Sequence, residues 1–387
     1  MPDLPGKMKY QMVETHEELK KAAQVLAGAR SIALDLEGDS MFHYGDTLCL
    51  AQVSDGSRTW LIDPLKIKDL SPLSAILGNT GVEKILHGSD YDIRLIRGRL
   101  GINCPPIFDT ELAARFLGMA RSGLADVLAK RFGVSLDKKF QKDDWSQRPL
   151  PDEMLAYAAA DVHWLIRLAE MMKEDLKRLG RLDWVEEECD LLARAPDRRR
   201  ENGPLHLRFR GAAVMDRRSL AILEAILQMR ESLAQERDRP PFKVLDPDAI
   251  RQIIQQRPET DQALLRIKGL GRRSEKFRAA VLSAVRSGLE LPESRLPVYP
   301  KGERRRSGKS NWSPLSVQNL KEWRNRRAAA LGLDCSLVCT TSMIQALAAR
   351  RPLTPEALDQ VEGLRNWQKR EFGAEICVVL RRGCPKK

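Results

Sequence analysis

The sequence predicts an α/β domain, built as a mixed sheet flanked by helices, followed by two all-α helical domains. Three observations indicate this arrangement. Strand-like segments occur only in the first third of the chain, where they alternate with helical patterns. From about residue 213 onward, the apolar residues follow helical spacing only. This helical part contains two blocks of similar sequence, which indicates a duplicated module.

Length and composition are typical of a multidomain protein of the cell interior. The chain has 387 residues, too many for one average domain. Its seven cysteines form no CxxC pair, which argues against a disulfide scaffold or a zinc cluster. The sequence contains neither a signal-like apolar core nor a run of roughly 20 apolar residues. We therefore expect a cytoplasmic protein without a membrane-spanning segment.

Charge is divided unevenly along the chain. Residues 1–190 contain 25 Lys and Arg against 31 Asp and Glu, a net charge of −6, whereas the remainder contains 40 against 22, a net charge of +18. Because phosphate contacts dominate nucleic-acid affinity, the basic half predicts a polyanionic partner. A basic surface that only maintains solubility is the alternative.

The first domain is expected to span residues 1–195. An opening helix at THEELKKAAQVLAG precedes the strictly alternating strand SIALDLEG, and DTLCLAQVSDGSRTWLIDPL contains two further strands around an SDGS turn. These three strands should be antiparallel neighbours. Next come strand EKILHG, helix DYDIRLIRGRLG, strand PPIFD and helix TELAARFLG. Helix GLADVLAKRFG and one long helix from about Pro151 to Leu179 complete the domain.

Two linkers and two helical domains should follow. Residues 196–212 and 293–312 are rich in charge, Pro and Gly, as linkers are. Each contains three consecutive arginines, at 198–200 and 304–306, which could contact phosphate or keep the linker extended. The helical domains are expected at 213–292 and 313–387, and IKGLGRR in the first corresponds to VEGLRNW in the second.

Two acids occur on one face of the first long strand. Asp35 and Glu37 are two positions apart in SIALDLEG, so both side chains project to the same side, about 7 Å apart along the backbone. Carboxylates this close repel each other unless protons or cations relieve them, and hard oxygen ligands suit Mg²⁺ or Mn²⁺. A solvated strand face would explain the pair if it were considered alone.

A third acid, Asp92, follows the strand EKILHG. Ser89 and Asp92 fit the S-x-x-D capping box of a helix N-terminus, so capping alone would explain this acid. Asp90 is a competing candidate at the same turn. We prefer Asp92 because the helix that follows would direct it back across the sheet.

A phenol and a carboxylate occur together in LAYAAADVHWL. Tyr157 and Asp161 are four residues apart and therefore lie on one face of a helix. Small neighbours would let this face approach the strand that carries the first two acids; they are Ala156, Ala158, Ala159 and Ala160. The alternative is a tyrosine of the core with Asp161 near the surface.

The order of these motifs resembles the DEDD 3′→5′ exonuclease superfamily. D-x-E on the first strand, an Asp after a later strand and Y-x-x-x-D on a late helix are similar to its three motifs. The tyrosine is typical of the DEDDy subgroup, since the histidine subgroup has His at the position of Ala156. QKDDWSQRPLPDEMLAYAAADVHWL is similar to a segment of the ribonuclease D family, and the helical blocks resemble HRDC domains. The resemblance implies a ribonuclease H-like exonuclease domain followed by two HRDC domains, of which the second is the more divergent.

The resemblance also implies the chemistry. In that family the acids hold two divalent metal ions, Mg²⁺ or Mn²⁺, and the matching residues here are Asp35, Glu37, Asp92 and Asp161. One ion would supply hydroxide and the other would stabilise the leaving 3′ oxygen. Tyr157 would orient the attacking water or help to deprotonate it, and we favour orientation because a phenol with an ordinary pKa of about 10 is a poor base at neutral pH. The expected products are nucleoside 5′-monophosphates.

The implied substrate is RNA, namely the 3′ ends of tRNA precursors or other structured RNA, trimmed by a monomer. Met41 and Phe42 are candidates for the wedge against the terminal base. Gln141 and Arg148 could contact RNA or, with Trp145, brace the helix. A DNA exonuclease and a catalytically inactive RNA-binding scaffold are the alternatives.

Other residues near these motifs have simpler expected roles. Trp312, Trp323 and Trp367 could stack on bases, although for Trp323 we favour packing in a helical core. His87 and His163 lack metal-ligand spacing, and we expect ordinary hydrogen bonds from them.

Overall fold

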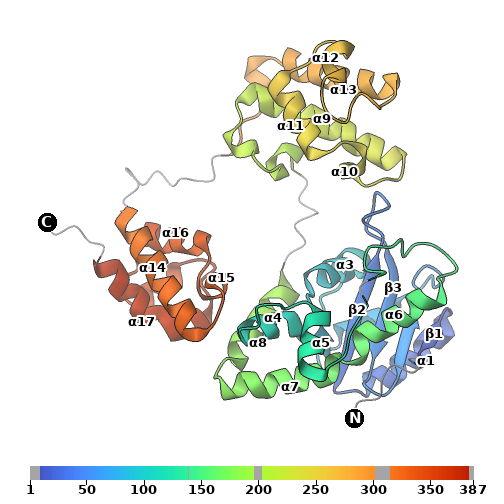
Figure 1. Ribbon diagram of the computed structural model, residues 1–387, viewed down its shortest axis with the longest axis vertical. Coiled ribbons are helices and arrows are strands. Elements are labelled where there is room, and N and C mark those ends of the chain that lie inside the picture. Colours follow the sequence, from blue (N-terminus) through green and yellow to red (C-terminus); the bar gives the residue numbers. More distant parts are fainter. Residues whose placement is uncertain (1–8, 138, 196–202, 301–313, 383–387) are drawn as a thin grey trace. The chain divides into compact units, whose positions relative to one another are not determined.

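The computed structural model describes residues 9–137, 139–195, 203–300 and 314–382 (Figure 1). They form two compact units. Of these, residues 9–38, 48–137, 139–195 and 314–382 belong to the first unit, and residues 39–47 and 203–300 belong to the second. Trp312 and both arginine triplets lie outside the described residues.

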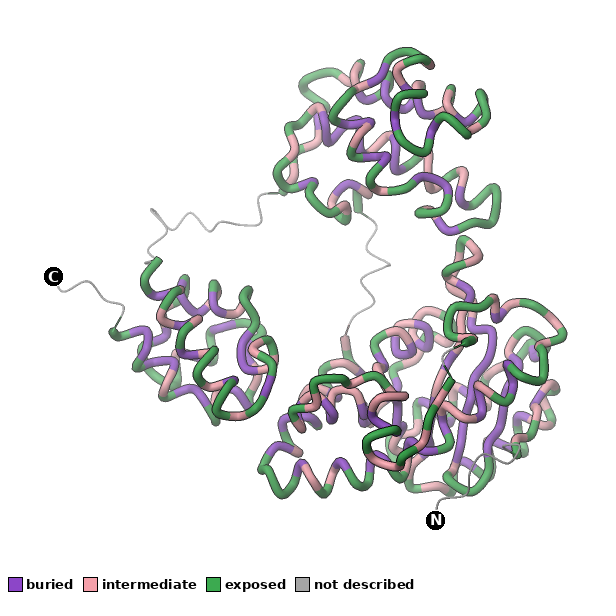
Figure 2. Tube along the Cα trace, viewed as in Figure 1, coloured by how far each residue is buried: buried purple, intermediate pink, exposed green. Residues whose placement is uncertain are grey.

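A six-stranded mixed sheet forms the centre of the first unit, in the order β1-β4-β3-β2-β5-β6. As predicted, β3 pairs antiparallel with both β2 and β4, while β5 and β6 extend the sheet in parallel. The short β1, which was not predicted, pairs in parallel with β4. Every residue of β3 and β4 is buried, as Figure 2 shows for the sheet. The strands are β1 (Gln11–Val13), β2 (Ser31–Gly38), β3 (Leu48–Ser54), β4 (Thr59–Ile62), β5 (Glu83–Leu86) and β6 (Ile107–Asp109).

Helices α1 to α8 pack around this sheet. The predicted opening helix is α1, which begins after Thr15 because Thr15 and Glu18 form a capping box. Figure 1 shows α6 across the face of β2 and β3. The helices are α1 (His16–Ala27), α2 (Ser71–Gly78), α3 (Asp90–Leu100), α4 (Thr110–Phe116), α5 (Leu124–Phe132), α6 (Asp152–His163), α7 (Leu165–Arg178) and α8 (Leu182–Arg194).

The single long helix predicted from Pro151 is wrong. The chain forms two helices that meet at Trp164, which is both the C-cap of α6 and the N-cap of α7. The Trp164 ring stacks on Phe132 with centroids 5.1 Å apart, and α7 then packs on β2 and β5. Tertiary packing therefore ends α6 where the local sequence has no helix breaker.

The first helical module has a hydrophobic core of its own. Its longest helices, α9 and α13, approach each other closely at Gly288, where a Cβ atom would lie only 2.5 Å from the Ile222 Cα. The elements of this module are η2 (Leu205–Arg208), η3 (Ala212–Val214), α9 (Arg217–Glu236), α10 (Pro241–Val244), α11 (Pro247–Gln256), α12 (Asp261–Leu265), α13 (Glu275–Glu290) and η4 (Glu293–Arg295).

The second helical module repeats an irregular feature of the first. Helices α11 and α16 each end on an arginine in the left-handed conformation, Arg257 with φ 46° and Arg351 with φ 47°, and a proline follows each. Residues other than glycine rarely adopt this conformation, so its recurrence supports a duplication. The elements are α14 (Pro314–Leu331), α15 (Cys335–Val338), α16 (Thr341–Arg350), η5 (Glu356–Gln360) and α17 (Asn366–Arg382).

The second module shares the hydrophobic core of the sheet domain. Trp367 of α17 stacks on Trp184 of α8, with ring centroids 4.5 Å apart. Glu187 accepts hydrogen bonds from the backbone N–H groups of Asn366 (2.6 Å) and Trp367 (2.9 Å). Glu188 accepts from the Trp367 indole at 3.0 Å. The sheet domain and the second module therefore fold as parts of one unit.

No single helix in the described part of the chain is long and apolar enough to cross a membrane. The pair Pro314–Leu331 and Cys335–Arg350, bent by 112°, meets these criteria only when its two members are joined.

Candidate active site

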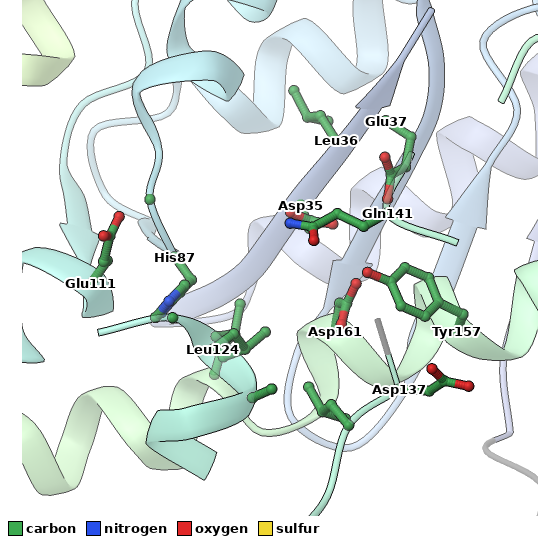
Figure 3. A pocket seen from close by; sticks show the side chains of 15 residues that line it. Asp35, Leu36, Glu37, His87, Glu111, Leu124, Asp137, Gln141, Tyr157 and Asp161 are labelled. Carbon is green, nitrogen blue, oxygen red and sulfur yellow. The ribbon is translucent and has the colours of Figure 1, made fainter. Parts of the chain in front are cut away.

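Three predicted acids converge at the centre of the sheet domain. Asp35 and Glu37 extend from β2 and Asp161 from α6, and one carboxylate oxygen from each lies within 4.8 Å of the others. Figure 3 shows these three side chains directed toward one another, with Tyr157 beside them. The two-residue period of the strand and the four-residue period of the helix thus bring the side chains together as predicted.

The alanines of α6 only partly behave as predicted. Ala158 and Ala159 are buried and pack in a small core with Leu50 of β3 and Leu61 of β4. Ala156 is exposed and Ala160 is half-buried, and neither belongs to this core. The close approach of α6 to the sheet therefore depends on two of the four alanines.

Asp92, at the start of α3, is buried against the same strand. Its side chain is 6% exposed, and its Oδ1 accepts a hydrogen bond from the Leu36 backbone N–H at 3.1 Å. Asp90 instead faces solvent and pairs with Arg94. Ser89 makes no side-chain capping bond, so the capping-box explanation of Asp92 is wrong. The Ser89 hydroxyl donates to Asp109 instead.

Burial and mutual repulsion make the acids hard to ionise. Desolvation raises the pKa of Asp35 to about 7 and, together with the charge of Asp35, raises the pKa of Asp161 to about 8. Desolvation and the neighbouring carboxylates raise the pKa of Glu37 and of Asp92 well above the ordinary range. A site of this kind is stabilised by protons or by cations.

Tyr157 shares a hydrogen bond with Asp161. Desolvation, followed by the charges of Asp161 and Glu37, raises the pKa of the phenol far above its ordinary value. Its hydroxyl therefore favours the protonated form. A protonated phenol can orient a water molecule or a substrate oxygen.

Asp35, Glu37 and Asp161 line a cavity of about 390 Å³, whereas Asp92 lies outside its lining. None of the described residues that line it is Lys or Arg, although Glu111 and Asp137 add two further carboxylates to its wall. Such a cavity repels an anionic substrate unless cations are bound. The oxygen-only donor set and the close spacing fit divalent ions such as Mg²⁺ or Mn²⁺. The residues present therefore fit the expected metal site.

Comparisons with known proteins agree with this geometry. Residues 10–177 match the model of a 3′-5′ exonuclease family, and residues 219–285 and 316–380 each match the HRDC domain. The chain is 31% identical over 378 residues to a ribonuclease D of Nitrobacter hamburgensis, covering 96% of this chain and 95% of the relative. It is 32% identical over 273 residues to an exosome complex component 10 homolog of Drosophila melanogaster, covering 68% of this chain and 30% of that protein.

The chain belongs to the ribonuclease D family. The crystal structure of Escherichia coli RNase D aligns with a TM-score of 0.74 at 26% identity, covering 97% of this chain and 99% of that one. The catalytic core of RRP6 from Trypanosoma brucei aligns with a TM-score of 0.59 at 25% identity, covering 74% and 83%. The ribonuclease H-like domain with two HRDC domains is confirmed, and the chain is a 3′→5′ exoribonuclease.

The predicted RNA contacts lie in different places. Gln141 lines the cavity, and Figure 3 shows its side chain extending toward Asp35. Met41 and Phe42 belong to residues 39–47 of the second unit and are not among the residues that line the cavity. Their contact with a terminal base stays a prediction.

Arg148 and Trp145 brace the structure. The Arg148 guanidinium donates to both carboxylate oxygens of Asp63, at 2.7 and 2.8 Å, and to the backbone carbonyl of Cys49. It also donates to the carbonyls of Trp145 and Gln147. Trp145 is 1% exposed. Of the two roles predicted for this pair, the structure explains the bracing role.

The remaining histidines and tryptophans do not join the acidic cluster. His87 Nδ1 lies 2.9 Å from the Thr110 hydroxyl, the ordinary hydrogen bond that was expected. His163 is exposed. The Trp323 indole is buried and donates to Glu375, and Trp367 packs against α8, so neither presents a free face for a base.

Several residues at the site were not predicted. Glu111, Leu124 and Leu136 line the cavity, and Asp109 lies behind it. The signal at Asp109 is local, because an Asp before TEL in IFDTEL is a typical helix N-cap. Its connection to the turn before Asp92 depends on pairing between β5 and β6, which sequence periodicity does not specify.

Proposed function

We propose that this exoribonuclease trims the 3′ ends of structured RNA, such as tRNA precursors, as a cytoplasmic monomer. In this proposal the carboxylates of Asp35, Glu37, Asp92 and Asp161 hold Mg²⁺ or Mn²⁺, about two ions per site. The Escherichia coli relative is described as an exoribonuclease involved in structured RNA processing, which supports this substrate class.

One observation carries the proposal. Three carboxylates gather within 4.8 Å in a cavity whose described lining contains no Lys or Arg. The buried Asp92 adds a fourth negative group next to β2. A phosphodiester can enter such a cavity only together with divalent cations, which is the requirement of metal-assisted phosphoryl chemistry.

The side chains of the site have separate roles at the scissile phosphate. Divalent ions held by the carboxylates would supply an activated water and charge stabilisation for the leaving 3′ oxygen. The four carboxylates fix the positions at which this occurs. The Tyr157 hydroxyl, which stays protonated beside Asp161, orients the attacking water. Gln141, an amide at the cavity wall, supplies a neutral donor to the phosphate or the terminal ribose.

The first HRDC module offers a contact for the body of the RNA. Its hairpin between α12 and α13 exposes four basic side chains that form no ion pair within the described ranges: Arg266, Lys268, Arg272 and Lys276. The corresponding hairpin of the second module carries Glu362, Asn366 and Trp367. Glu187 of α8 accepts hydrogen bonds from the backbone N–H groups of the last two. The duplicated modules are therefore not equivalent, and the first is the better suited to bind phosphates.

A trimming assay tests the proposal. A tRNA with a 3′ extension and a single-stranded DNA of the same extension sequence are incubated with Mg²⁺, and shortening and released nucleotides are followed by gel and chromatography. We expect 5′-monophosphates from the RNA and a loss of about 10²-fold or more in Asp161→Asn. Asp152→Asn is the matched control, because Asp152 is exposed on the same helix and lies outside the cavity.

The alternatives give distinct outcomes in this assay. Shortening of the DNA alone would make the protein a DNA exonuclease. RNA binding without shortening by the wild type, at any Mg²⁺ or Mn²⁺ concentration, would indicate an inactive scaffold. Equal rates for Asp161→Asn and the wild type would overturn the site assignment.

A further inference from the structure

Asp109 is a buried carboxylate that the proposed chemistry does not use. It is the last residue of β6 and the N-cap of α4, and it is 2% exposed. Among the described residues it has no ion pair with Lys or Arg. A buried carboxylate without a cation is costly unless hydrogen-bond donors surround it. Its donors therefore indicate what it does.

Five donors converge on this carboxylate, from two different turns. Oδ1 accepts from the backbone N–H groups of Glu111 (2.8 Å) and Leu112 (3.2 Å), which is the ordinary cap of α4. Oδ1 also accepts from Gly88 N at 3.0 Å. Oδ2 accepts from the Ser89 backbone N–H and from the Ser89 hydroxyl, both at 2.8 Å. A cap for α4 requires only the first two of these bonds.

The other three bonds fix the start of α3. Ser89 is the N-cap of α3, and its own hydroxyl makes no capping bond to that helix because it donates to Asp109. Gly88 adopts φ +73°, and a Cβ atom there would lie 2.8 Å from the Glu111 carboxylate. The turn is thus held tightly between β5 and the start of α4, with Asp109 as its anchor.

Asp92 lies in the first turn of the helix whose start this anchor fixes. Its Oδ1 accepts from Leu36 N, between the two acids of β2. A shift or rotation of the first turn of α3 would move Asp92 away from Asp35 and Glu37. Hydrogen bonds from Asp109 thus hold the Ser89 turn, the backbone of α3 joins this turn to Asp92, and Asp92 in turn bonds to β2. Outer residues of this kind typically orient metal ligands.

We propose that Asp109 is a positioning residue of the exonuclease reaction, which holds the first turn of α3 so that the Asp92 carboxylate faces Asp35 and Glu37. This inference rests on the proposed role of Asp92 as a metal ligand. Asp109 itself lies outside the cavity lining, so it would act only through Asp92.

The substitution Asp109→Asn isolates this role. The amide oxygen can still cap α4, whereas the amide nitrogen cannot accept the backbone N–H of Ser89. We expect the Mn²⁺ concentration for half-maximal activity to rise about 10- to 100-fold. At saturating Mn²⁺ the rate should return to within a few-fold of wild type, with an unchanged KM for RNA. Mn²⁺ binding followed by electron paramagnetic resonance should weaken by the same factor, without any substrate.

Matched variants separate positioning from a general loss of structure. Asp246→Asn changes an equivalent cap, since Asp246 accepts from two backbone N–H groups at the start of α11 in the first helical module. It should leave the Mn²⁺ response unchanged. Ser89→Ala removes one of the Oδ2 bonds and should shift the Mn²⁺ response in the same direction by a smaller factor. If Asp109→Asn does not fold, the Mn²⁺ response of Ser89→Ala tests the positioning role in its place.

Two results would overturn the proposal. A third would overturn only the assignment of Asp92 as a metal ligand, on which the proposal rests. A folded Asp109→Asn with the Mn²⁺ response of wild type would contradict the positioning role. So would a loss of activity that is the same at every Mn²⁺ concentration, since that indicates a smaller folded fraction. If Asp92→Asn also binds Mn²⁺ as wild type does, the proposed metal site is wrong, whatever Asp109 does.

Discussion

At the scale of single residues, burial and mutual repulsion raise the pKa values of the acids in the site. The pKa of Asp35 is raised to about 7 and that of Asp161 to about 8, against an ordinary value of 3.8 for both. Desolvation is the first cause in each case, and the charge of Asp35 is the second for Asp161. The folded chain without metal therefore holds protons that the unfolded chain has released.

This difference predicts how stability depends on pH. Between about pH 4 and pH 8 the folded state binds more protons than the unfolded state, so the free energy of unfolding falls as pH rises. Metal binding displaces these protons and should stabilise the protein more at high pH. In differential scanning fluorimetry with EDTA, we expect Tm to fall from about pH 5 to pH 8, and Mg²⁺ to raise Tm by about 4 °C or more at the higher pH only.

Asp161→Asn provides the control for this prediction. Removing one charge from the cluster should reduce the decline of Tm with pH and the response to Mg²⁺, while Asp152→Asn should behave as wild type. A Tm of the wild type that rises from pH 5 to pH 8 in EDTA, or an equal response to Mg²⁺ at both pH values, would contradict the assignment.

At the scale of elements, the docking of α8 on α17 makes the second HRDC module part of the catalytic unit. Glu188 accepts hydrogen bonds from the Trp367 indole and from Arg365, each at 3.0 Å. Trp367 is completely buried. Loss of the Glu188 carboxylate would leave the indole N–H without an acceptor in a buried position.

We predict that Glu188→Ala lowers the free energy of unfolding by about 1–3 kcal/mol in urea denaturation. Glu186→Ala, the same change at an exposed position of the same helix, should change it by less than about 0.5 kcal/mol. Neither variant should alter Mn²⁺ binding. Equal stabilities of the two variants would show that the module is not docked through these contacts.

The elements also show how far the sequence could be interpreted. Periodicity placed Asp35 with Glu37 and Tyr157 with Asp161, because strands and helices repeat every two and every 3.6 residues. The break at Trp164 was missed, since it depends on packing against Phe132. Local spacing suggested a capping box at Ser89. In the structure the Ser89 hydroxyl instead donates a hydrogen bond to Asp109, 20 positions away. Contacts between distant residues override local signals in both cases.

At the scale of the whole molecule, the uneven charge has a physical basis. The acidic first half contains the carboxylates of the site, and in their proposed role as metal ligands basic residues could not replace them. The surplus of Lys and Arg lies beyond residue 190. The sequence indicated this division, but it could not show that one HRDC module packs on the sheet domain while the other has a separate core. That difference depends on the tertiary contacts of Trp367 and Glu187.

Direct titration with Mn²⁺ tests the central claim that these carboxylates form a divalent-metal site. By isothermal titration calorimetry of the full chain, we expect the wild type and Asp152→Asn to bind about two ions. Asp35→Asn and Asp161→Asn should lose at least one ion or bind about 10²-fold more weakly, while remaining folded by circular dichroism. Titration curves of these two variants that superimpose on the wild type would contradict the claim.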